Sequence, residues 1–217
     1  MDNIDRPAPF DVVYQVKTGG VAVGKMSRRF EIDALDSYRF TSIIEAEGLV
    51  ALLKPTRIEE SSTGIWRDGR AVAERYAYEK KSGKKRKETV IAFDWAQGQA
   101  QASINGTHVN SAVTAGTLDK LNYQLAVMRD LAAGTQTLAY RVADVGESKD
   151  YALEQRPTEQ VKVGGKTYDT VPVTYSRTDG RRTVLWCAAV LGYLPVKIEY
   201  TEKDGAVTRA LLVPAKP

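Results

Sequence analysis

Reactive side chains are scarce in this sequence of 217 residues, which holds one cysteine, Cys187, and one histidine, His108. A single cysteine excludes an intramolecular disulfide but does not identify the compartment. One Cys with one His also leaves a zinc site of the usual nitrogen and sulfur type short of ligands. No motif of a known nucleophile surrounds Cys187, although a dyad with His108 stays open because dyad partners meet in space. We therefore predict a protein that is not an enzyme and that uses no metal and no other cofactor.

Long hydrophobic runs are missing as well. No uninterrupted apolar stretch approaches the ~18 residues that a membrane helix needs, so we predict no transmembrane segment. The first residues, MDNIDRPAPF, lack the apolar region of a signal peptide. Either the protein is not exported, or its signal peptide has been removed and replaced by a starting Met. We predict that residues 1–8 are disordered or were added to the chain, and that residues 9–213 form a single β-rich domain.

Positive charge is concentrated in one segment. The formal net charge is +4, and six of the 31 Lys and Arg residues lie in KKSGKKRK at 80–87. Ser82-Gly83 is a turn dipeptide, so this segment is either a solvated hairpin tip or a surface for anionic lipid or nucleic acid. No aromatic side chain is interleaved, which disfavours nucleic acid. The candidate contacts for an anionic surface are Lys80, Lys81, Lys84, Lys85, Arg86 and Lys87.

Turn dipeptides, by contrast, are frequent and recur about every 8–15 residues. Between them lie runs rich in Val, Ile, Thr and Tyr, as in VKIEY at 196–200, where apolar and charged side chains alternate. This pattern is typical of antiparallel hairpins and predicts about ten to thirteen strands. The dipeptides are Gly19-Gly20, Asp68-Gly69, Ser82-Gly83, Asn105-Gly106, Gly164-Gly165, Asp179-Gly180 and Asp204-Gly205.

The segment TLDKLNYQLAVMRDLAAG at 117–134 breaks the strand pattern. Its apolar residues recur at spacings of three and four, which predicts an amphipathic helix over about residues 117–133. Thr117 suits the N-cap, and Gly134 suits the position that follows the last turn. The apolar face is formed by Leu118, Leu121, Leu125, Met128 and Leu131. We predict a mainly β fold, with a strongly curved antiparallel sheet or an unclosed β-barrel packed around this one central helix.

Two further apolar segments bear on a binding site. GLVALLKP at 48–55 lacks strand alternation, and it is either a short buried helix or an apolar lip at the mouth of a cavity. In TVLWCA at 183–188, strand alternation places Trp186 and Cys187 on opposite faces. Cys187 is then a core residue, while Trp186 lines a cavity or packs on the helix. The candidate ligand contacts are Leu49, Val50, Leu52, Leu53 and Trp186.

Three segments in order resemble a known family. They are PFDVVYQVKTGGVAVGKMSRRFEI near the start, TLDKLNYQLAVMRDL in the middle and TVLWCAAVLGYLPVKIEYTEKDG near the end. Together they resemble an uncharacterised family of Gram-negative bacterial envelope proteins, catalogued only as a domain of unknown function, over roughly residues 9–213. The resemblance implies export by a cleaved signal peptide and a periplasmic location, and it transfers no catalytic residues. The expected architecture is also similar to the periplasmic lipoprotein carriers (LolA, LolB and RseB-like proteins), whose unclosed barrels hold acyl chains.

These observations lead to two functional hypotheses. The first is a non-enzymatic envelope protein that binds an apolar or amphipathic ligand, such as a lipid or an acyl chain, in the concave sheet. The alternative is a structural or protein-interaction module that meets another envelope protein through a sheet edge. Pro172 in TVPVTY supports the alternative, since a proline cannot donate to a strand ladder and suggests an edge strand or a bulge.

Overall fold

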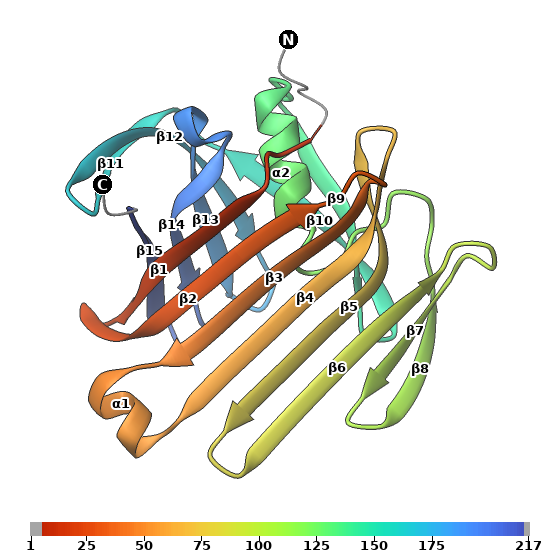
Figure 1. Ribbon diagram of the computed structural model, residues 1–217, viewed down its shortest axis with the longest axis horizontal. Helices are drawn as coiled ribbons and strands as arrows, with labels where there is room; N and C mark the ends of the chain where they lie inside the picture. Colours follow the sequence, from red (N-terminus) through yellow and green to blue (C-terminus); the bar gives the residue numbers. More distant parts are fainter. Residues whose placement is uncertain (1–5, 215–217) are drawn as a thin grey trace.

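Fifteen strands lie in one curved antiparallel sheet in the computed structural model, which describes residues 6–214 (Figure 1). The first eight are β1 (Phe10–Thr18), β2 (Val21–Ile32), β3 (Ser37–Ala46), β4 (Thr56–Arg67), β5 (Arg70–Ser82), β6 (Lys85–Asp94), β7 (Gln99–Ile104) and β8 (Thr107–Ala112). The others are β9 (Leu138–Asp144), β10 (Glu147–Gln155), β11 (Glu159–Val163), β12 (Lys166–Ser176), β13 (Arg182–Ala188), β14 (Leu194–Thr201) and β15 (Val207–Val213). The helices are α1 (Gly48–Leu53), α2 (Tyr123–Ala132) and the short 3-10 helix η1 (Ala189–Leu191). The predicted mainly β fold with an unclosed, curved sheet is confirmed.

The order of strands in space is β8-β7-β6-β5-β4-β3-β2-β1-β15-β14-β13-β12-β10-β9, and β11 pairs beside β12. Because neighbours are antiparallel, the connections that follow β1, β3, β5, β12 and β14 all leave the same edge of the sheet. We call it the lower edge, as it appears in Figure 1. The β2–β3, β4–β5 and β11–β12 turns and η1 leave the opposite, upper edge.

Six of the seven predicted turn dipeptides fall entirely in connections between strands, while in the seventh Ser82 ends β5 and Gly83 begins the turn. In the β7–β8 hairpin, Asn105 and Gly106 have φ of +47° and +88°, the left-handed values that a type I′ turn requires at both central positions. Such a turn twists in the same sense as the strands it joins, which is why Asn-Gly predicts a hairpin so well. The hairpins therefore follow from local chemistry.

The concave face of the sheet is aromatic and apolar along β1 to β6. Cross-strand register aligns the side chains of one inward row: Phe10, Phe30, Phe40, Ser62, Tyr76 and Ile91. Phe30 and Phe40 pack edge to face with ring centroids 6.3 Å apart. This row forms a core with Leu121, Leu125 and Met128, so α2 lies inside the curve.

The opposite side of α2 packs against the second half of the sheet. Val127 and Leu131 share a core with Leu138 of β9, Val142 of β9 and Leu185 of β13. The helix therefore fills the space between the two arms of the sheet, as a central helix in an unclosed barrel would. The predicted apolar face at 118, 121, 125, 128 and 131 is buried throughout.

The start of α2 differs from the prediction. The helix begins at Tyr123 rather than near 117, and the N-cap is Asn122 rather than Thr117. Leu118 instead bridges to Val142 of β9 in parallel, and the Asp119 carboxylate accepts the backbone N–H of Asn122 at 2.8 Å. These contacts replace the first helical turn. Gly134, with φ of +72°, follows the C-cap as predicted.

Pro172 does not lie in an edge strand, since β12 pairs with β13 throughout its second half. On the other side of β12, pairing with β11 ends at Thr170 and pairing with β10 begins at Val173. The carbonyl of Pro172 accepts the N–H of Arg156 on that side, so its nitrogen also points there. The missing N–H therefore falls in the gap between β10 and β11, which corrects the prediction of an edge strand or bulge.

The ends of the described chain lie near the upper edge. Pro7 is buried, and the Arg6 guanidinium donates to the Asp36 carboxylate at 2.8 Å in the β2–β3 turn. Of the segment 1–8 that we expected to be disordered or added, residues 1–5 lie outside the described residues. Within residues 6–214, no helix has the length and apolar character needed to cross a bilayer.

Candidate functional site

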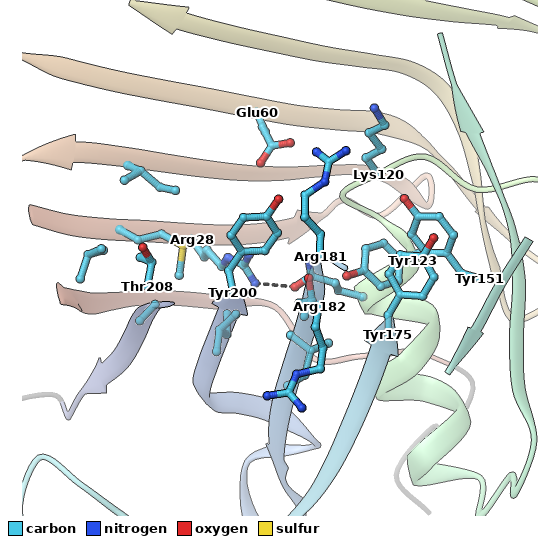
Figure 2. Close-up of a pocket in the computed structure, with 18 of the residues that line it drawn as sticks. Arg28, Glu60, Lys120, Tyr123, Tyr151, Tyr175, Arg181, Arg182, Tyr200 and Thr208 are labelled. Carbon is cyan, nitrogen blue, oxygen red and sulfur yellow. Dashed lines mark hydrogen bonds between the residues drawn. The ribbon is translucent and has the colours of Figure 1, made fainter. Parts of the chain in front are cut away.

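A cavity of about 310 Å³ lies inside the curved sheet, on the side of α2 that faces the lower edge (Figure 2). We call it the inner cavity. Its apolar lining consists of Val16, Met26, Ile44, Leu185, Ile198 and Ala210. Its charged lining consists of Arg28, Glu60, Lys120, Arg177, Arg181 and Arg182. Four tyrosines, Tyr123, Tyr151, Tyr175 and Tyr200, also line it, as do the polar residues Gln124, Thr183 and Thr208.

Strand register explains why the apolar residues converge. Val16 of β1 is opposite Ala210 of β15, Ala210 is opposite Ile198 of β14, and Ile198 is opposite Leu185 of β13. Residues that are directly opposite share a face of the sheet, so these four side chains form one continuous inward row. The apolar side of the cavity is thus built from both ends of the sequence.

Arg28 is the deepest cation of the inner cavity. The residue is only 8% exposed, and its Nη1 donates to Oε1 of Gln124 in α2 at 2.6 Å. Its Nε is buried and has no hydrogen-bond partner within residues 6–214. A buried charge with an unpaired N–H is costly, and an anionic group is the partner that offsets this cost most strongly. The guanidinium is therefore poised for an anion.

Glu60, the acidic residue of the lining, is engaged elsewhere. Register places it on the same face as Arg28 but two strands away, with Ser42 between them. Its carboxylate accepts a hydrogen bond from the Tyr76 hydroxyl at 2.7 Å. Burial raises the pKa of Glu60, and the Tyr76 hydrogen bond and the charges of Arg28 and Lys120 oppose that shift. A raised pKa weakens Glu60 as a permanent counter-charge for Arg28.

Three tyrosines stand together as one wall of the inner cavity. The rings of Tyr151 and Tyr175 are stacked with centroids 3.9 Å apart, and Tyr123 meets Tyr151 edge to face at 5.4 Å. They come from α2, β10 and β12, so the wall joins the helix to the second arm of the sheet. Aromatic rings with a polar tip suit a ligand that has both apolar and polar parts.

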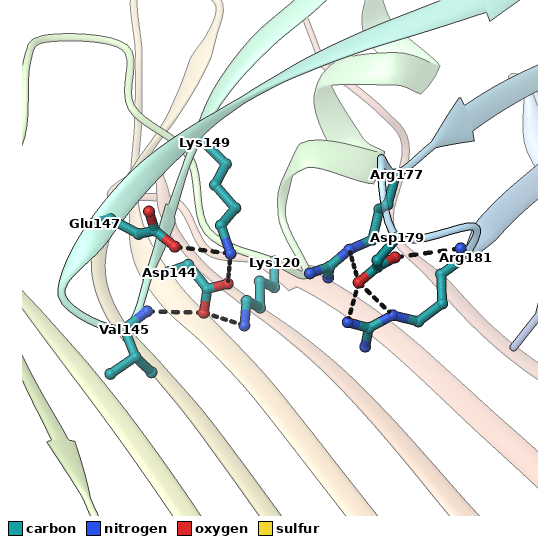
Figure 3. A network of polar contacts seen from close by, with 8 residues as sticks. All are labelled: Lys120, Asp144, Val145, Glu147, Lys149, Arg177, Asp179 and Arg181. Atoms are coloured by element: carbon teal, nitrogen blue, oxygen red, sulfur yellow. Dashed lines mark hydrogen bonds and ion pairs between the residues drawn. The ribbon is translucent and has the colours of Figure 1, made fainter. Parts of the chain in front are cut away.

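The rim of the inner cavity is a nearly balanced network of ion pairs (Figure 3). Asp179 lies between Arg177 and Arg181, and the hydrogen bond from Arg181 lowers the pKa of Asp179 to about 2. Asp144 lies between Lys120 and Lys149. Burial raises the pKa of Asp144, but the hydrogen bond from Lys120 and the neighbouring charges outweigh it, and the result is about 2. The cations of this network thus have acidic partners. Arg28 differs from them because its buried Nε has no partner within residues 6–214.

A buried polar cluster separates the inner cavity from the upper edge. Ser62 donates to Asp119 at 2.5 Å, Asn122 donates to the Tyr38 hydroxyl at 3.0 Å, and the Tyr38 and Ser62 hydroxyls are 3.0 Å apart. Burial raises the pKa of Asp119 to about 6, against the effect of the hydrogen bonds it accepts. The cluster ties the loop before α2 to β3 and β4, and it lines neither cavity.

A second cavity, of about 950 Å³, opens at the upper edge between α2 and the β4–β5 and β6–β7 turns. Its cations are half-buried or exposed, and two of them have acidic partners: Arg129 pairs with Asp130 at 2.5 Å and Arg141 pairs with Asp150 at 3.1 Å. It is larger than the inner cavity but holds no buried cation without a partner among the described residues. The inner cavity is the stronger candidate site.

The residues predicted from sequence lie elsewhere. Trp186 is on the outward face of β13, where its indole N–H donates to Glu159 of β11 and Lys197 lies 3.7 Å from its ring centre. It lines neither cavity, because strand alternation turns Leu185 inward and Trp186 outward. The structure therefore corrects the expected place of Trp186. The prediction that Trp186 and Cys187 lie on opposite faces is confirmed, because Trp186 contacts Glu159 and Lys197 while Cys187 shares a core with Leu131 of α2.

The chemistry that Cys187 and His108 could offer is not assembled. Cys187 is fully buried among apolar side chains, and burial raises the pKa of its thiol. His108 is exposed in β8, at the end of the sheet. The two cannot form a dyad in this fold. Within residues 6–214, no group of three or more His, Cys, Asp or Glu side chains is placed to hold a metal ion.

The segment at 48–53 forms the predicted helix, α1, but the expectation that it is buried is wrong. Leu49, Leu52 and Leu53 are 78%, 81% and 87% exposed. Neither they nor Val50 lines a cavity. The six cations at 80–87 are all exposed on the β5–β6 hairpin, whose turn is at Gly83-Lys84, one residue later than predicted.

An open antiparallel sheet, an enclosed helix and an interior cavity define a β-barrel-like protein. The chain belongs to the family described as protein of unknown function (DUF3108), which matches residues 13–212. Its fold is similar to the crystal structure of a beta-barrel-like protein of domain of unknown function DUF1849 from Brucella abortus, with a TM-score of 0.63, 12% identity and coverage of 96% of this chain and 97% of that chain. No curated protein matches the chain. Membership of a domain-of-unknown-function family is confirmed, while the periplasmic location and the likeness to lipoprotein carriers stay predictions.

Proposed function

We propose that the protein is a binding protein for an amphipathic molecule that carries an anionic group, and that the inner cavity holds this molecule. The observation that carries the proposal is Arg28, a buried guanidinium whose Nε has no partner within the described residues. A carboxylate or phosphate beside Arg28 would accept that N–H and neutralise the charge. The lining supplies no catalytic constellation, so the proposed role is non-enzymatic.

The rest of the lining fits the apolar part of such a molecule. The inward row of Val16, Ala210 and Ile198 runs across β1, β15 and β14, on the same face of the sheet as Arg28. The tyrosine wall lines the same cavity. An apolar body with few, well-placed polar groups is the usual character of a ligand pocket, and about 310 Å³ is at the small end of that range. The ligand class is therefore a fatty acid or a similar single-chain anionic amphipath.

A location in the cell envelope is part of the proposal. It is supported by the resemblance of the three sequence segments to envelope proteins and by the open, barrel-like sheet. A lipid or acyl chain in the envelope would be a natural source of the amphipathic ligand.

The alternative role, a module that meets another envelope protein through a sheet edge, is favoured by one observation. The strand β8 ends the sheet, pairs with β7 alone in the described chain, and is mostly exposed. An unpaired strand edge can accept a strand from a partner. The inner cavity carries the stronger argument, because an unpaired buried charge is rarer than an exposed edge.

The experiment is a titration of the delipidated protein with cis-parinaric acid, a fatty acid that becomes fluorescent when bound. We expect saturable binding, and we expect Arg28→Gln to weaken it about tenfold or more, because a charge-assisted hydrogen bond is lost. The matched control is Arg29→Gln, since Arg29 is the next residue but is exposed and pairs with Glu31 at 2.8 Å on the outer face.

Competition by dodecanoate and by dodecanol separates the charge from the chain. In the wild-type protein, dodecanoate should compete far better than dodecanol. In Arg28→Gln, the acid and the alcohol should compete equally well. Equal competition in the wild-type protein, or unchanged binding of the acid by a folded Arg28→Gln variant, would contradict the proposal.

A further inference from the structure

The helix α1 presents an apolar surface to solvent. Its sequence, GLVALL, contains no charged residue, and none of its residues is buried. Leu49, Leu52 and Leu53 are each at least 78% exposed. Exposed leucines occur singly on many proteins, but three on one short uncharged helix form a patch that calls for a partner.

The basic tip of the β5–β6 hairpin lies directly beside this helix. The backbone N–H of Gly83, in the hairpin turn, donates to the carbonyl of Pro55, just after α1, at 3.0 Å. The hydroxyls of Thr56 and Ser82 are also 3.0 Å apart. Two segments about thirty residues apart in sequence therefore form one continuous part of the lower edge (Figure 1). We call it the leucine–lysine surface: Leu49, Leu52, Leu53, Lys54, Lys80, Lys84, Lys85 and Lys87.

The cations of the hairpin divide between two faces. Lys81 and Arg86 belong to the outer face, where both pair with Glu79, at 2.8 Å and 2.5 Å. Lys80 and Lys87 are directly opposite each other on the other face, with no acidic partner among the described residues. Like charges directly opposite in a sheet are destabilising. An anion from outside the protein would offset the repulsion between Lys80 and Lys87.

The acidic residues near α1 do not neutralise these lysines. Glu47, at the N-cap of α1, pairs with Lys25 at 3.7 Å, and Glu45 pairs with Arg57. Both ion pairs lie along the neighbouring strands β2 to β4. The leucine–lysine surface thus combines exposed leucines with cations that have no partner in residues 6–214.

We propose that the leucine–lysine surface docks the protein on an anionic lipid bilayer. The leucines enter the boundary between headgroups and acyl chains, and the lysines meet the headgroup phosphates. A second copy of the chain is a poor occupant, because it would bring the same lysines together. Nucleic acid is a poor occupant too, since no aromatic side chain of the surface offers stacking and the leucines would stay in water.

The position of this surface relative to the inner cavity gives the docking a consequence. The loops at 177–181 and 202–206 leave the sheet at the same lower edge, and Arg177, Arg181 and Tyr200 belong to the cavity lining. A docked protein would therefore hold the rim of the inner cavity toward the bilayer. The docking itself requires no ligand in the cavity, so the two proposals can fail separately.

The test is co-sedimentation of the full chain with sucrose-loaded vesicles. One set is pure phosphatidylcholine, and the other contains about 30 mol% phosphatidylglycerol. We expect binding to the anionic vesicles alone, weakened by NaCl because the attraction is screened. Replacing four lysines (K80Q, K84Q, K85Q and K87Q) should reduce partitioning about tenfold or more. Replacing three leucines (L49Q, L52Q and L53Q) should reduce it to a similar extent at unchanged charge.

The matched control is the double variant K162Q/K166Q, which removes exposed cations from the β11–β12 hairpin at the upper edge. It should bind the anionic vesicles like the wild-type protein. All three variants alter exposed side chains, so their melting temperatures should stay close to that of the wild-type protein. Equal binding to both kinds of vesicle, or undiminished binding by the leucine variant, would overturn the proposal. The proposal would also be overturned if the protein bound no vesicles and instead formed a complex with another protein, in the absence of lipid, that was lost when the same leucines were replaced.

Discussion

Ser62, in the middle of β4, donates a 2.5 Å hydrogen bond to the fully buried carboxylate of Asp119, in the loop that leads into α2. This contact joins residues 57 positions apart and anchors the central helix to the first arm of the sheet. Asp119 also accepts the backbone N–H groups of Leu121 and Asn122, both at 2.8 Å. A charged group in this position makes the stability of the fold depend on pH.

Asp119→Asn should remove part of that pH dependence. The pKa of Asp119 is near 3.8 in the unfolded chain and about 6 in the fold, because burial disfavours its charged form. The stability from this group is complete below pH 3.8 and is lost as pH rises through about 6. The loss is about 3 kcal/mol at pH 7. Urea unfolding at pH 4.5 and pH 7 measures this loss. The free energy of unfolding should differ less between the two pH values in Asp119→Asn than in the wild-type protein. The buried Glu60 acts in the same direction, so Glu60→Gln should flatten the profile further. If the free energy of unfolding of the variants depended on pH as steeply as that of the wild-type protein, this explanation would be contradicted.

Gly64→Ala should destabilise the β4–β5 pair strongly. A Cβ at Gly64 would lie 2.0 Å from the carbonyl oxygen of Val72 and 3.0 Å from Cα of Ala73, so backbone would have to move. We expect a loss of about 2 kcal/mol or more in the free energy of unfolding, measured by urea denaturation. The control is Gly83→Ala, where nothing lies within 4 Å and only the φ of +57° opposes a side chain. It should cost about 1 kcal/mol. The same cost at both positions would argue against the close approach of β4 and β5.

Pro172→Ala should cost about 1 kcal/mol, which is less than the loss of a ladder bond, although Pro172 lies inside a central strand. Its nitrogen faces the gap between β10 and β11, so the new N–H meets no strand partner there. Thr174→Pro, two residues along the same strand, should cost about 3 kcal/mol or more, because Thr174 pairs with β10 and β13 and a ladder bond is lost. Chemical denaturation of the two variants side by side tests this contrast. A large loss in Pro172→Ala would show that the proline has another role.

Cys187 should be inert in the folded protein. Its thiol is fully buried, and burial raises its pKa, so little thiolate forms near neutral pH. A thiol reagent such as Ellman's reagent should react at pH 8 only as the chain unfolds, and its rate should follow the denaturant curve. Prompt reaction in native buffer would contradict the burial of this residue.

The fold was predictable where local chemistry decides it. Asn105-Gly106 and the other turn dipeptides predicted the hairpins, and the spacing of Leu121, Leu125 and Met128 predicted α2. The strand number was set too low, at about ten to thirteen rather than fifteen, because strands such as β8 carry little apolar alternation. The start of α2 could not be predicted from the chain alone, since the bridge between Leu118 and Val142 is a tertiary contact.

The candidate site was only partly predictable. Arg28 was missed, although a signal exists: in KMSRRFE the residues Met26, Arg28 and Phe30 alternate with polar ones, which places Arg28 on the apolar face. The exposure of Leu52 in α1 carries no such signal, because an apolar segment does not reveal whether the protein covers it. The contact between Gly83 and Pro55, which joins the leucines to the lysines, depends on the path of two hairpins.

The pairing of β1 with β15 has a consequence for how the protein is made. Val13 of β1 is opposite Val213 of β15, so the last strand to be synthesised in the described chain lies in the middle of the sheet. Until β15 leaves the ribosome, β1 and β14 both present open edges, and the arm from β1 to β8 has no link to the arm from β9 to β14 across the seam. Folding of the whole sheet must therefore wait for the C-terminal strand, and a nascent chain that stops before Val207 is a natural client for a chaperone.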